Sequence, residues 1–300
     1  MKYLSLFSGI GGFELGIHRV FPGAMCVGYS EIEPNAIAVY QECFPNHRNL
    51  GSVCEIRGNL GIDLLVGGSP CQDLSALRRM SKKDPSTLGL NGKKSSLFFE
   101  YVRILRENQP RHFILENVAS MSKESRDEIS RILGVQPVLL NSNTCSAQNR
   151  KRLFWCNFPV RQLTQRSRET MKDILVPVKI ARTLQVPDKN IVSFIRRHGE
   201  EKLGKRISER GSIVNDTAAP KSYTLTCHHR VWVIDRRIND MFIRKLHPLE
   251  AERLQGFPDN HTNLRSRKLT NPARLKLCGN AVTVGIIAYI CSELSKNVEL

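Results

Sequence analysis

Three kinds of reactive side chain stand at places where a β-sheet would bring them together. Cys71 follows a Gly-Gly-Ser-Pro turn, and Glu116 ends a short apolar run. Arg150 and Arg152 would share one face if the segment 148–152 is extended. A thiol, a carboxyl and two guanidiniums would then line one cleft.

This set of side chains suits a reaction on an electron-poor heterocycle. A thiolate can add to a ring carbon, a protonated carboxyl can hold a ring nitrogen, and an arginine can bind a carbonyl oxygen. Cytosine meets these demands, because its C5 becomes nucleophilic only after a group has added at C6. Most cysteines are buried and inert, so Cys71 is a candidate nucleophile only together with the neighbouring groups.

A glycine-rich loop after the first apolar run is typical of nucleotide binding. Its residues are Phe7, Ser8, Gly9, Ile10, Gly11 and Gly12. Glu31 lies nineteen residues beyond Gly12, where an acidic side chain can accept hydrogen bonds from ribose hydroxyls. The loop and Glu31 together predict an adenosine-containing cofactor. The third glycine of the dinucleotide fingerprint is missing, which disfavours a nicotinamide.

Alternating strands and helices are predicted to position these residues. Apolar runs predict strands at 3–7, 24–29, 62–66, 112–115 and 135–140. Apolar residues at helical spacing predict intervening helices such as 33–43 and 96–107. This alternation is typical of an α/β fold with a parallel sheet and crossover helices. Ligands bind such sheets at the carboxyl ends of the strands, where the candidate residues lie.

The chain is strongly basic, and much of the excess lies in one segment. The 300 residues contain 45 Lys and Arg against 28 Asp and Glu, a formal charge of +17, which favours a polyanion such as nucleic acid as partner. Residues 159–239 hold 17 Lys and Arg against 8 Asp and Glu, and the strand–helix alternation fades there. We expect an insertion into, or appendage of, the α/β domain; a merely solvated basic surface is the alternative. Helical patterns return at 248–254 and 281–294.

Composition excludes several other classes of protein. With 41% hydrophobic and 24% charged residues, the chain is expected to be soluble and globular rather than disordered or fibrous. The longest apolar stretch, 281–291, is too short to cross a bilayer. Nine cysteines without short metal-binding spacings predict reduced, intracellular thiols. Cys227, His228 and His229 are not expected to bind a metal, because neighbouring residues in an extended segment point to opposite faces.

Taken in order, seven sequence blocks resemble the C5-cytosine DNA methyltransferases. They are LSLFSGIGGFELG (4–16), YSEIEPNA (29–36), IDLLVGGSPCQDLS (62–75), FILENV (113–118), QNRKRLF (148–154), RKLHPLEAERLQGFPD (244–259) and GNAV (279–282). The resemblance covers the whole chain outside 159–239. It implies a Rossmann-like, S-adenosylmethionine-dependent methyltransferase sheet with helices on both faces, formed by 1–158 and 240–300. It also implies a small target recognition domain at 159–239.

The resemblance implies a set of residues that bind S-adenosylmethionine. They are Phe7, Ser8, Gly9, Ile10, Gly11, Gly12, Glu31, Ile32, Ser52, Pro70, Asn280 and Val282. Glu31 is expected on the ribose and Ile32 against the adenine, and the C-terminal block is expected to bring Asn280 and Val282 to the same pocket. The chain departs from the family at Ser52, where Asp is common for adenine binding.

The resemblance also implies the chemical roles. Cys71 is expected to attack C6 of a cytosine flipped out of the duplex, because C6 is inaccessible within the base stack. Glu116 is expected to stabilise the protonated N3 and the amino edge, and Arg152 to contact O2. Arg150 is expected to support the catalytic loop or the environment of the nucleophile.

Contacts with duplex DNA are expected from two regions. The polar and basic stretch 72–95 is expected to be a mobile loop that closes over DNA, and 159–239 is expected to read bases in the major groove. The residues expected to contact DNA are Gln72, Ser75, Arg78, Arg79, Lys82, Lys83, Thr224 and Thr226.

Three alternatives remain open at this point. They are an RNA cytosine methyltransferase, a catalytically silent DNA-binding regulator and a nicotinamide oxidoreductase. The sizeable basic segment favours DNA over RNA, and the latter two alternatives leave Cys71, Glu116 and Arg152 unexplained. We further expect a monomer without a metal in bacterial cytoplasm, encoded by a bacterium or phage. It would act beside a cognate restriction endonuclease, in phage self-protection or as a solitary regulator.

Overall fold

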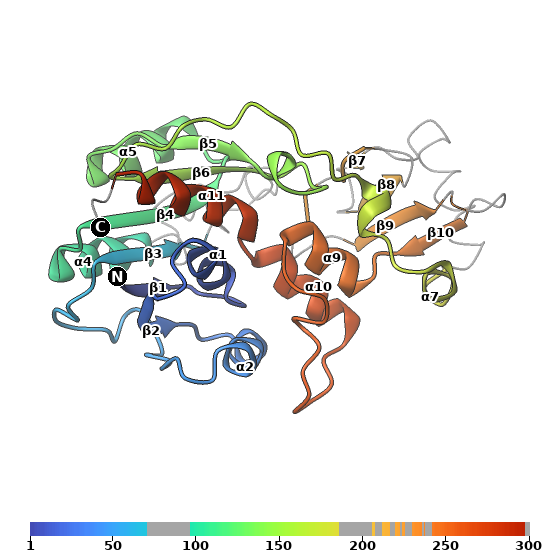
Figure 1. Ribbon diagram of the computed structural model, residues 1–300, viewed down its shortest axis with the longest axis horizontal. Coiled ribbons are helices and arrows are strands. Elements are labelled where there is room, and N and C mark those ends of the chain that lie inside the picture. The colour runs from blue at the N-terminus through green and yellow to red at the C-terminus, as the bar shows by residue number, and fades with distance from the viewer. Residues whose placement is uncertain are drawn as a thin grey trace, which may run out of the picture. The chain divides into compact units, whose positions relative to one another are not determined.

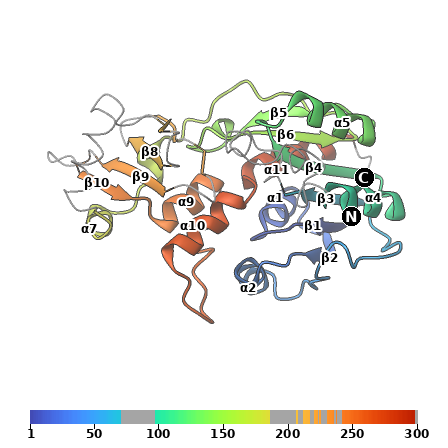
Figure 2. The same ribbon diagram turned by 180° about the vertical axis from the view of Figure 1, so that it is seen from behind.

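The chain forms two compact units, shown in Figures 1 and 2. The computed structural model describes residues 1–70, 97–185, 206–207, 212–216, 220–222, 224–225, 230–235, 237 and 242–297. Unit 1 comprises Met1–Asn141, Lys151–Leu163 and Ile286–Leu300, and unit 2 comprises Ser142–Arg150 and Thr164–Gly285. The assignment of 159–239 to target recognition and of the remainder to catalysis stays a prediction.

Unit 1 is built on a six-stranded sheet with the order β2-β1-β3-β4-β6-β5. Its strands are β1 (Lys2–Leu6), β2 (Met25–Ser30), β3 (Leu64–Gly68), β4 (His112–Val118), β5 (Val138–Asn141) and β6 (Lys151–Cys156). The five strands expected from the sequence are confirmed, with ends shifted by up to three residues. The neighbours β2, β1, β3 and β4 are parallel, so their carboxyl ends meet at one edge of the sheet.

The sheet is not entirely parallel, which corrects the expectation from the sequence. Strand β6 lies between β4 and β5 and runs antiparallel to both. The connection from β5 to β6, residues 142–150, contains only a single turn of 3₁₀ helix (Ser142–Thr144). That connection is too short for the helical crossover that a parallel neighbour requires.

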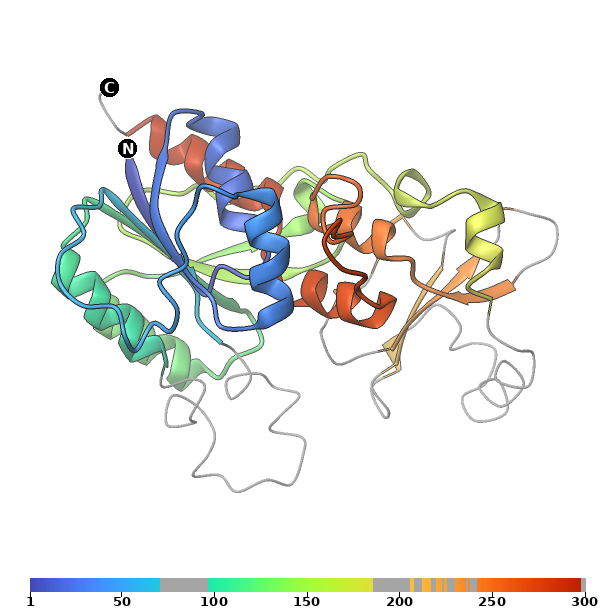
Figure 3. The same ribbon diagram turned by 90° about the horizontal axis from the view of Figure 1, so that it is seen from below.

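Helices cover both faces of this sheet. They are α1 (Gly12–Val20), α2 (Pro34–Cys43), α4 (Leu97–Asn108), α5 (Lys123–Leu133) and α11 (Val284–Ser295). In Figure 3, α4 and α5, in green, lie on one face, and α1 (blue) and α11 (red) lie on the other. Helices α1 and α11 pack closely. A Cβ added at Gly16 of α1 would come within 2.5 Å of the Ile287 side chain of α11. The expected helices 33–43 and 96–107 correspond to α2 and α4.

The core of unit 1 follows the two-residue period of its strands. Leu4 and Leu6 of β1 and Leu65 of β3 join one buried cluster with Phe98 and Tyr101 of α4. The alternate residues of these strands are buried as well, on the opposite face of the sheet. A sheet that is buried on both faces reads in the sequence as near-continuous apolar runs, which is why these strands could be predicted.

Unit 2 contains a four-stranded sheet with the order β10-β9-β8-β7. Its strands are β7 (Arg206–Ile207), β8 (Ser212–Asp216), β9 (Arg230–Asp235) and β10 (Phe242–Lys245), and its helices are α6 (Met171–Ile174), α7 (Val178–Arg182), α9 (Pro248–Gln255) and α10 (Asn271–Asn280). Helix α9 confirms the helix expected at 248–254. The helix expected at 281–294 begins at Val284 instead, because 281–283 separate α10 from α11.

One stretch of the described residues, 271–295, is long and apolar enough to cross a membrane by length and composition alone. It is divided between α10 and α11, and 67% of its most apolar window is buried within the protein. Burial of this kind is typical of core helices in a folded domain.

Candidate active site

The glycine-rich loop turns sharply between β1 and α1. Phe7, Gly9 and Gly11 have φ angles of 54°, 57° and 85°, in the left-handed region. This conformation is strained for Phe7, because non-glycine residues rarely adopt it, and such strain is concentrated at functional sites. At Gly11 a Cβ would come within 2.4 Å of the Phe44 ring, so both space and φ require glycine there.

Glu31, just after β2, holds this loop in place by a hydrogen bond. Its Oε2 accepts a hydrogen bond from the Gly9 amide at 2.9 Å. Its Oε1 accepts bonds from the amides of Ile32 and Glu33, at 2.8 and 2.9 Å. A carboxylate has about four acceptor positions, so Glu31 can still accept bonds from the hydroxyls of a ligand. The Ile32 side chain beside it is 68% exposed.

The segment that contains Ser52 lies next to the end of β2. Ser30 Oγ donates to the Gly51 carbonyl at 2.6 Å, and Asn49 Nδ2 donates to the Glu31 carbonyl at 3.1 Å. Ser52 is half-buried, and its hydroxyl accepts a bond from the Cys54 amide at 3.2 Å. Ser52, Glu31 and the glycine loop therefore belong to the same edge of the unit 1 sheet.

Glu116 and Arg152 form an ion pair at this edge of the sheet. Arg152 Nε lies 2.9 Å from Glu116 Oε1, and the side chains are only 16% and 15% exposed. Glu116 is near the end of β4 and Arg152 near the start of β6, two antiparallel neighbours. The pair presents a hydrogen-bond acceptor beside a donor, which suits the mixed edge of a heterocycle such as cytosine.

The end of β3 lies against the same carboxylate. Gly68 pairs with Glu116 in the parallel register, and a Cβ at Gly68 would lie 2.9 Å from Glu116 Oε2. Asn117 Nδ2 donates to Ser69 Oγ and to the Ser69 carbonyl, at 3.0 and 3.3 Å, which holds the chain just after β3. Pro70 follows, half-buried, and is the last described residue before Cys71.

Arg150 has different partners from Arg152. Its buried guanidinium donates to the backbone carbonyls of Leu225, Gly279 and Ala281, all in unit 2. Asn280 and Val282 also belong to unit 2, at the end of α10, with Asn280 exposed and Val282 half-buried. Thr224 Oγ1 donates to the Asn149 carbonyl at 2.6 Å, so this threonine lies beside the 148–150 segment.

Several predicted site residues lie outside the described residues. They are Cys71, Gln72, Ser75, Arg78, Arg79, Lys82, Lys83 and Thr226. Their roles stay predictions, as does the expected loop at 72–95. Within the described ranges, no group of three or more His, Cys, Asp or Glu side chains is arranged to hold a metal ion.

Sequence reasoning missed a buried carboxyl group in the helix that follows the glycine loop. Glu14, in the first turn of α1, is fully buried, and burial raises the pKa of its carboxyl to about 7. Tyr3, Cys26 and Tyr40 are its neighbours, and their own pKa values are raised, chiefly by burial. Nothing in the sequence marks Glu14, because one acidic residue in an amphipathic helix is ordinarily exposed.

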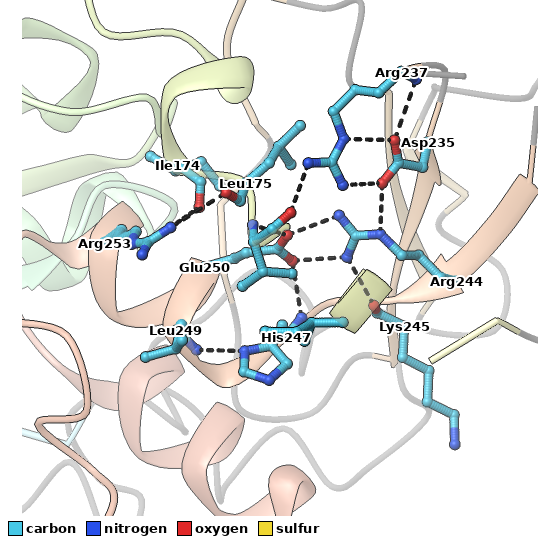
Figure 4. A network of polar contacts seen from close by, with 12 residues as sticks. Ile174, Leu175, Asp235, Arg237, Arg244, Lys245, His247, Leu249, Glu250 and Arg253 are labelled. Atoms are coloured by element: carbon cyan, nitrogen blue, oxygen red, sulfur yellow. Dashed lines mark hydrogen bonds and ion pairs between the residues drawn. The ribbon is translucent and has the colours of Figure 1, made fainter. Parts of the chain in front are cut away.

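Sequence reasoning also missed a buried chain of alternating charges in unit 2, shown in Figure 4. Arg237 donates to both carboxylate oxygens of Asp235, at 2.9 and 2.6 Å, and Arg244 Nε donates to Asp235 Oδ2 at 2.9 Å. Arg244 also donates to both oxygens of Glu250, at 2.8 and 2.7 Å. Arg244, Asp235 and Glu250 have no exposed surface. Arg244 and Glu250 stand inside the block 244–259, whose composition alone shows no such pairing.

The sheet order and the glycine loop define a Rossmann-like fold of the kind found in methyltransferases. The chain is similar in structure to the methyltransferase EhMeth of Entamoeba histolytica, with a TM-score of 0.73 and 17% identity over 100% of this chain and 99% of that one. An E. coli structure described as a putative DNA modification methyltransferase encoded within prophage Cp gives a TM-score of 0.68 and 19% identity, over 99% of each chain. At these identities the likeness shows the fold.

The sequence narrows this class to one family. The sequence pattern of the C-5 cytosine-specific DNA methylases matches residues 1–174 and 160–296, so the chain belongs to this family of DNA (cytosine-5-)-methyltransferases. The Type II methyltransferase M1.ScrFI of Lactococcus lactis subsp. cremoris is 28% identical over 99% of this chain and 79% of its own length. The resemblance drawn from the sequence blocks is therefore confirmed.

Proposed function

We propose that the protein transfers a methyl group to C5 of a flipped-out cytosine in a short, specific duplex DNA sequence, through a covalent bond between Cys71 and C6. The Glu116–Arg152 pair carries this proposal. It stands at the carboxyl end of β4, and β3 beside it leads through Pro70 directly to Cys71. Membership of the methylase family supports the same reaction.

Each of these groups has a defined task in the proposed reaction. The Cys71 sulfur forms a bond to C6, and Glu116 holds a proton on N3, so the electron pair of the C5–C6 double bond becomes available at C5. Arg152 donates to O2 and keeps the ring in place. After C5 has taken the methyl group, the C5 proton leaves and the sulfur–C6 bond breaks, which restores the ring and the thiolate.

The residues of unit 1 fit S-adenosylmethionine, which supplies an electrophilic methyl group when bound. In the turn at Phe7–Gly12, Gly9 has no side chain to obstruct a ligand, and no atom lies within 4 Å of the position that its Cβ would take. Glu31, which accepts a bond from the Gly9 amide, has acceptor capacity left for ribose hydroxyls. Ile32, being largely exposed, can cover the adenine, and Ser52 and Pro70 lie at the same edge of the sheet. We assign Asn280 and Val282 to this cofactor as well.

The partners that we propose follow from charge and from the relatives. Duplex DNA would be held by the basic residues of 72–95 and read by 159–239, with Thr224 and Thr226 among its contacts. M1.ScrFI is named a Type II methyltransferase, which suggests a restriction endonuclease of the same specificity as a partner. We propose a cytoplasmic monomer.

Transfer of labelled methyl groups tests this proposal. The full chain is incubated with S-adenosylmethionine and PCR-amplified duplex DNA or transfer RNA, beside the Cys71→Ser variant, and modified cytosines are then mapped by conversion sequencing. The proposal predicts transfer to DNA at one short sequence and none by the variant. Transfer to RNA alone, or undiminished transfer by Cys71→Ser, would overturn it.

A further inference from the structure

We propose that Arg150 is a positioning residue that couples cofactor binding to DNA binding. Its guanidinium joins the segment assigned to the cofactor, 279–282, to Leu225, which follows Thr224, a residue assigned to DNA. This inference rests on the proposed function, which supplies those two assignments.

Three backbone carbonyls converge on the one guanidinium. Nη1 donates to the Leu225 carbonyl at 2.7 Å, and Nη2 donates to the carbonyls of Gly279 and Ala281 at 3.2 and 2.9 Å. Arg150 is 3% exposed, so water cannot readily replace a bond that is lost. Because the guanidinium is planar and rigid, a shift of either segment reorients the donors that hold the other.

The Leu225 side of this junction is tied to the backbone of the residues just before Arg150. The Ser222 amide donates to the Ala147 carbonyl at 2.7 Å, and the Asn149 amide donates to the Ser222 carbonyl at 2.9 Å. Thr224 Oγ1 donates to the Asn149 carbonyl at 2.6 Å. A DNA phosphate or base that engaged Thr224 would compete for this hydroxyl and disturb the position of the neighbouring Leu225 carbonyl.

The cofactor side of the junction is the turn after α10. Gln255 Nε2 donates to the carbonyls of Cys278 and Ala281, at 2.7 and 3.2 Å, and Gln255 Oε1 accepts a bond from Thr283 Oγ1 at 2.8 Å. Gln255 and Arg150 therefore share the Ala281 carbonyl as acceptor. No bond from Gln255 to Leu225 occurs among the described contacts, so Gln255 provides a matched control that touches the turn alone.

The consequence is a reciprocal effect between two ligands. If DNA binding favours one position of Leu225, it favours the matching position of 279–281 through Arg150, and the affinity for the cofactor changes. Linkage requires that the cofactor alter DNA affinity by the same factor, and such factors are commonly about 5-fold or more. If Arg150 only stabilised the fold, its substitution would lower both affinities, or the stability, without changing this coupling factor.

The coupling factor is measured directly with S-adenosylhomocysteine, which binds without turnover. Its Kd is determined by calorimetry for the full chain, alone and with a duplex that carries the site mapped in the methyl-transfer assay. We expect DNA to tighten binding about 5-fold or more in the wild type. The coupling factor should fall below about 2-fold in Arg150→Lys, which keeps the buried charge but cannot reach all three carbonyls. Gln255→Met should weaken binding with and without DNA equally. A wild-type coupling factor of one, or an unchanged factor in Arg150→Lys, overturns the inference.

Hydrogen exchange of the wild type provides a second test that depends on no variant. S-adenosylhomocysteine alone should slow exchange in a peptide that contains Thr224 and Leu225, and DNA alone should slow it at 279–282. Unchanged exchange at both places contradicts the inference, even if Arg150→Lys fails to fold. Failure of the proposed function would look different, because the wild type would then neither bind S-adenosylhomocysteine nor methylate DNA.

Discussion

Arg152 Nε and Glu116 Oε1 lie 2.9 Å apart across the antiparallel strands β6 and β4. The two side chains are mostly buried, and they fix each other's direction at the carboxyl end of β4. A donor and an acceptor that are oriented in advance need no rearrangement during a reaction, which is the basis of electrostatic stabilisation in active sites. The pair therefore links the sheet to the proposed chemistry.

Glu116→Gln should lower kcat for methyl transfer by about 10²-fold or more, because the amide cannot hold the proton on N3. The affinity for S-adenosylhomocysteine should stay unchanged, since Glu116 is assigned to the base. Steady-state kinetics and calorimetry measure the two effects. Glu128→Gln, which alters an exposed glutamate of α5, is the matched control and should behave as wild type. Full activity of Glu116→Gln would remove Glu116 from the reaction.

Gly68→Ala should reduce methyl transfer with little loss of stability. The new Cβ would lie 2.9 Å from Glu116 Oε2, so the carboxylate must move away from its position beside Arg152. A misplacement of about 1 Å can cost on the order of 100-fold in rate. Thermal unfolding and kcat are compared with those of Gly23→Ala, whose Cβ meets no atom within 4 Å. Equal kcat in the two variants would contradict this prediction.

The free energy of unfolding should fall as pH rises through the pKa of Glu14. Burial raises this pKa from about 4.5 to about 7, so the native state binds the proton more tightly than the unfolded state. The stabilisation is complete below about pH 4.5 and is lost as pH approaches and passes 7, by ~3 kcal/mol in total.

Urea unfolding between pH 5 and 8.5 measures this dependence. Glu14→Gln should remove the decrease, and the difference between the two proteins isolates Glu14 from other groups. His18 and His47 have lowered pKa values, mainly through burial, so they contribute the opposite slope in both proteins. Parallel curves for wild type and Glu14→Gln would show that Glu14 does not titrate in this range.

Arg244→Met should destabilise unit 2 strongly. It leaves the carboxylates of Asp235 and Glu250 buried without the arginine that lies between them, and breaking a buried pair in this way costs about 3–5 kcal/mol. Arg131→Met removes an exposed partner of Glu128 and should leave stability unchanged. Denaturant unfolding of both variants, compared with wild type, provides the measurement. Similar midpoints for the two variants would show that the buried pairs contribute nothing beyond an exposed pair.

The sequence predicted those parts of the fold that depend on local pattern. Strands β1 and β3 are near-continuous apolar runs because both faces of the sheet are covered. Pro34 and the Glu33 cap mark the start of α2. Strand β6 was not among the predicted strands, and only the segment 148–152 was considered as extended. Nothing in Lys151–Cys156 specifies an antiparallel neighbour. Its direction follows from the short connection to β5, which is a property of tertiary structure.

In the candidate site, too, residues marked by local pattern could be predicted, whereas contacts made by tertiary structure could not. Phe7, Glu31 and Glu116 could be located because each lies at or just after the end of a predicted strand. The structure places them at or near the carboxyl ends of β1, β2 and β4. The Arg150 junction could not be derived, because all its acceptors are backbone carbonyls, which carry no sequence signal. The buried state of Glu14 and Asp235 depends likewise on elements that are distant in the chain.

The proposed reaction depends on a covalent bond between Cys71 and C6 of the target cytosine. A duplex with 5-fluorocytosine at the mapped site tests it most directly, because C5 then carries no proton to lose and the sulfur–C6 bond cannot break after methyl transfer. With S-adenosylmethionine present, mass spectrometry should find one DNA strand attached to the peptide that contains Cys71, and none in Cys71→Ser. A stable noncovalent complex, or attachment at another cysteine, would contradict the account.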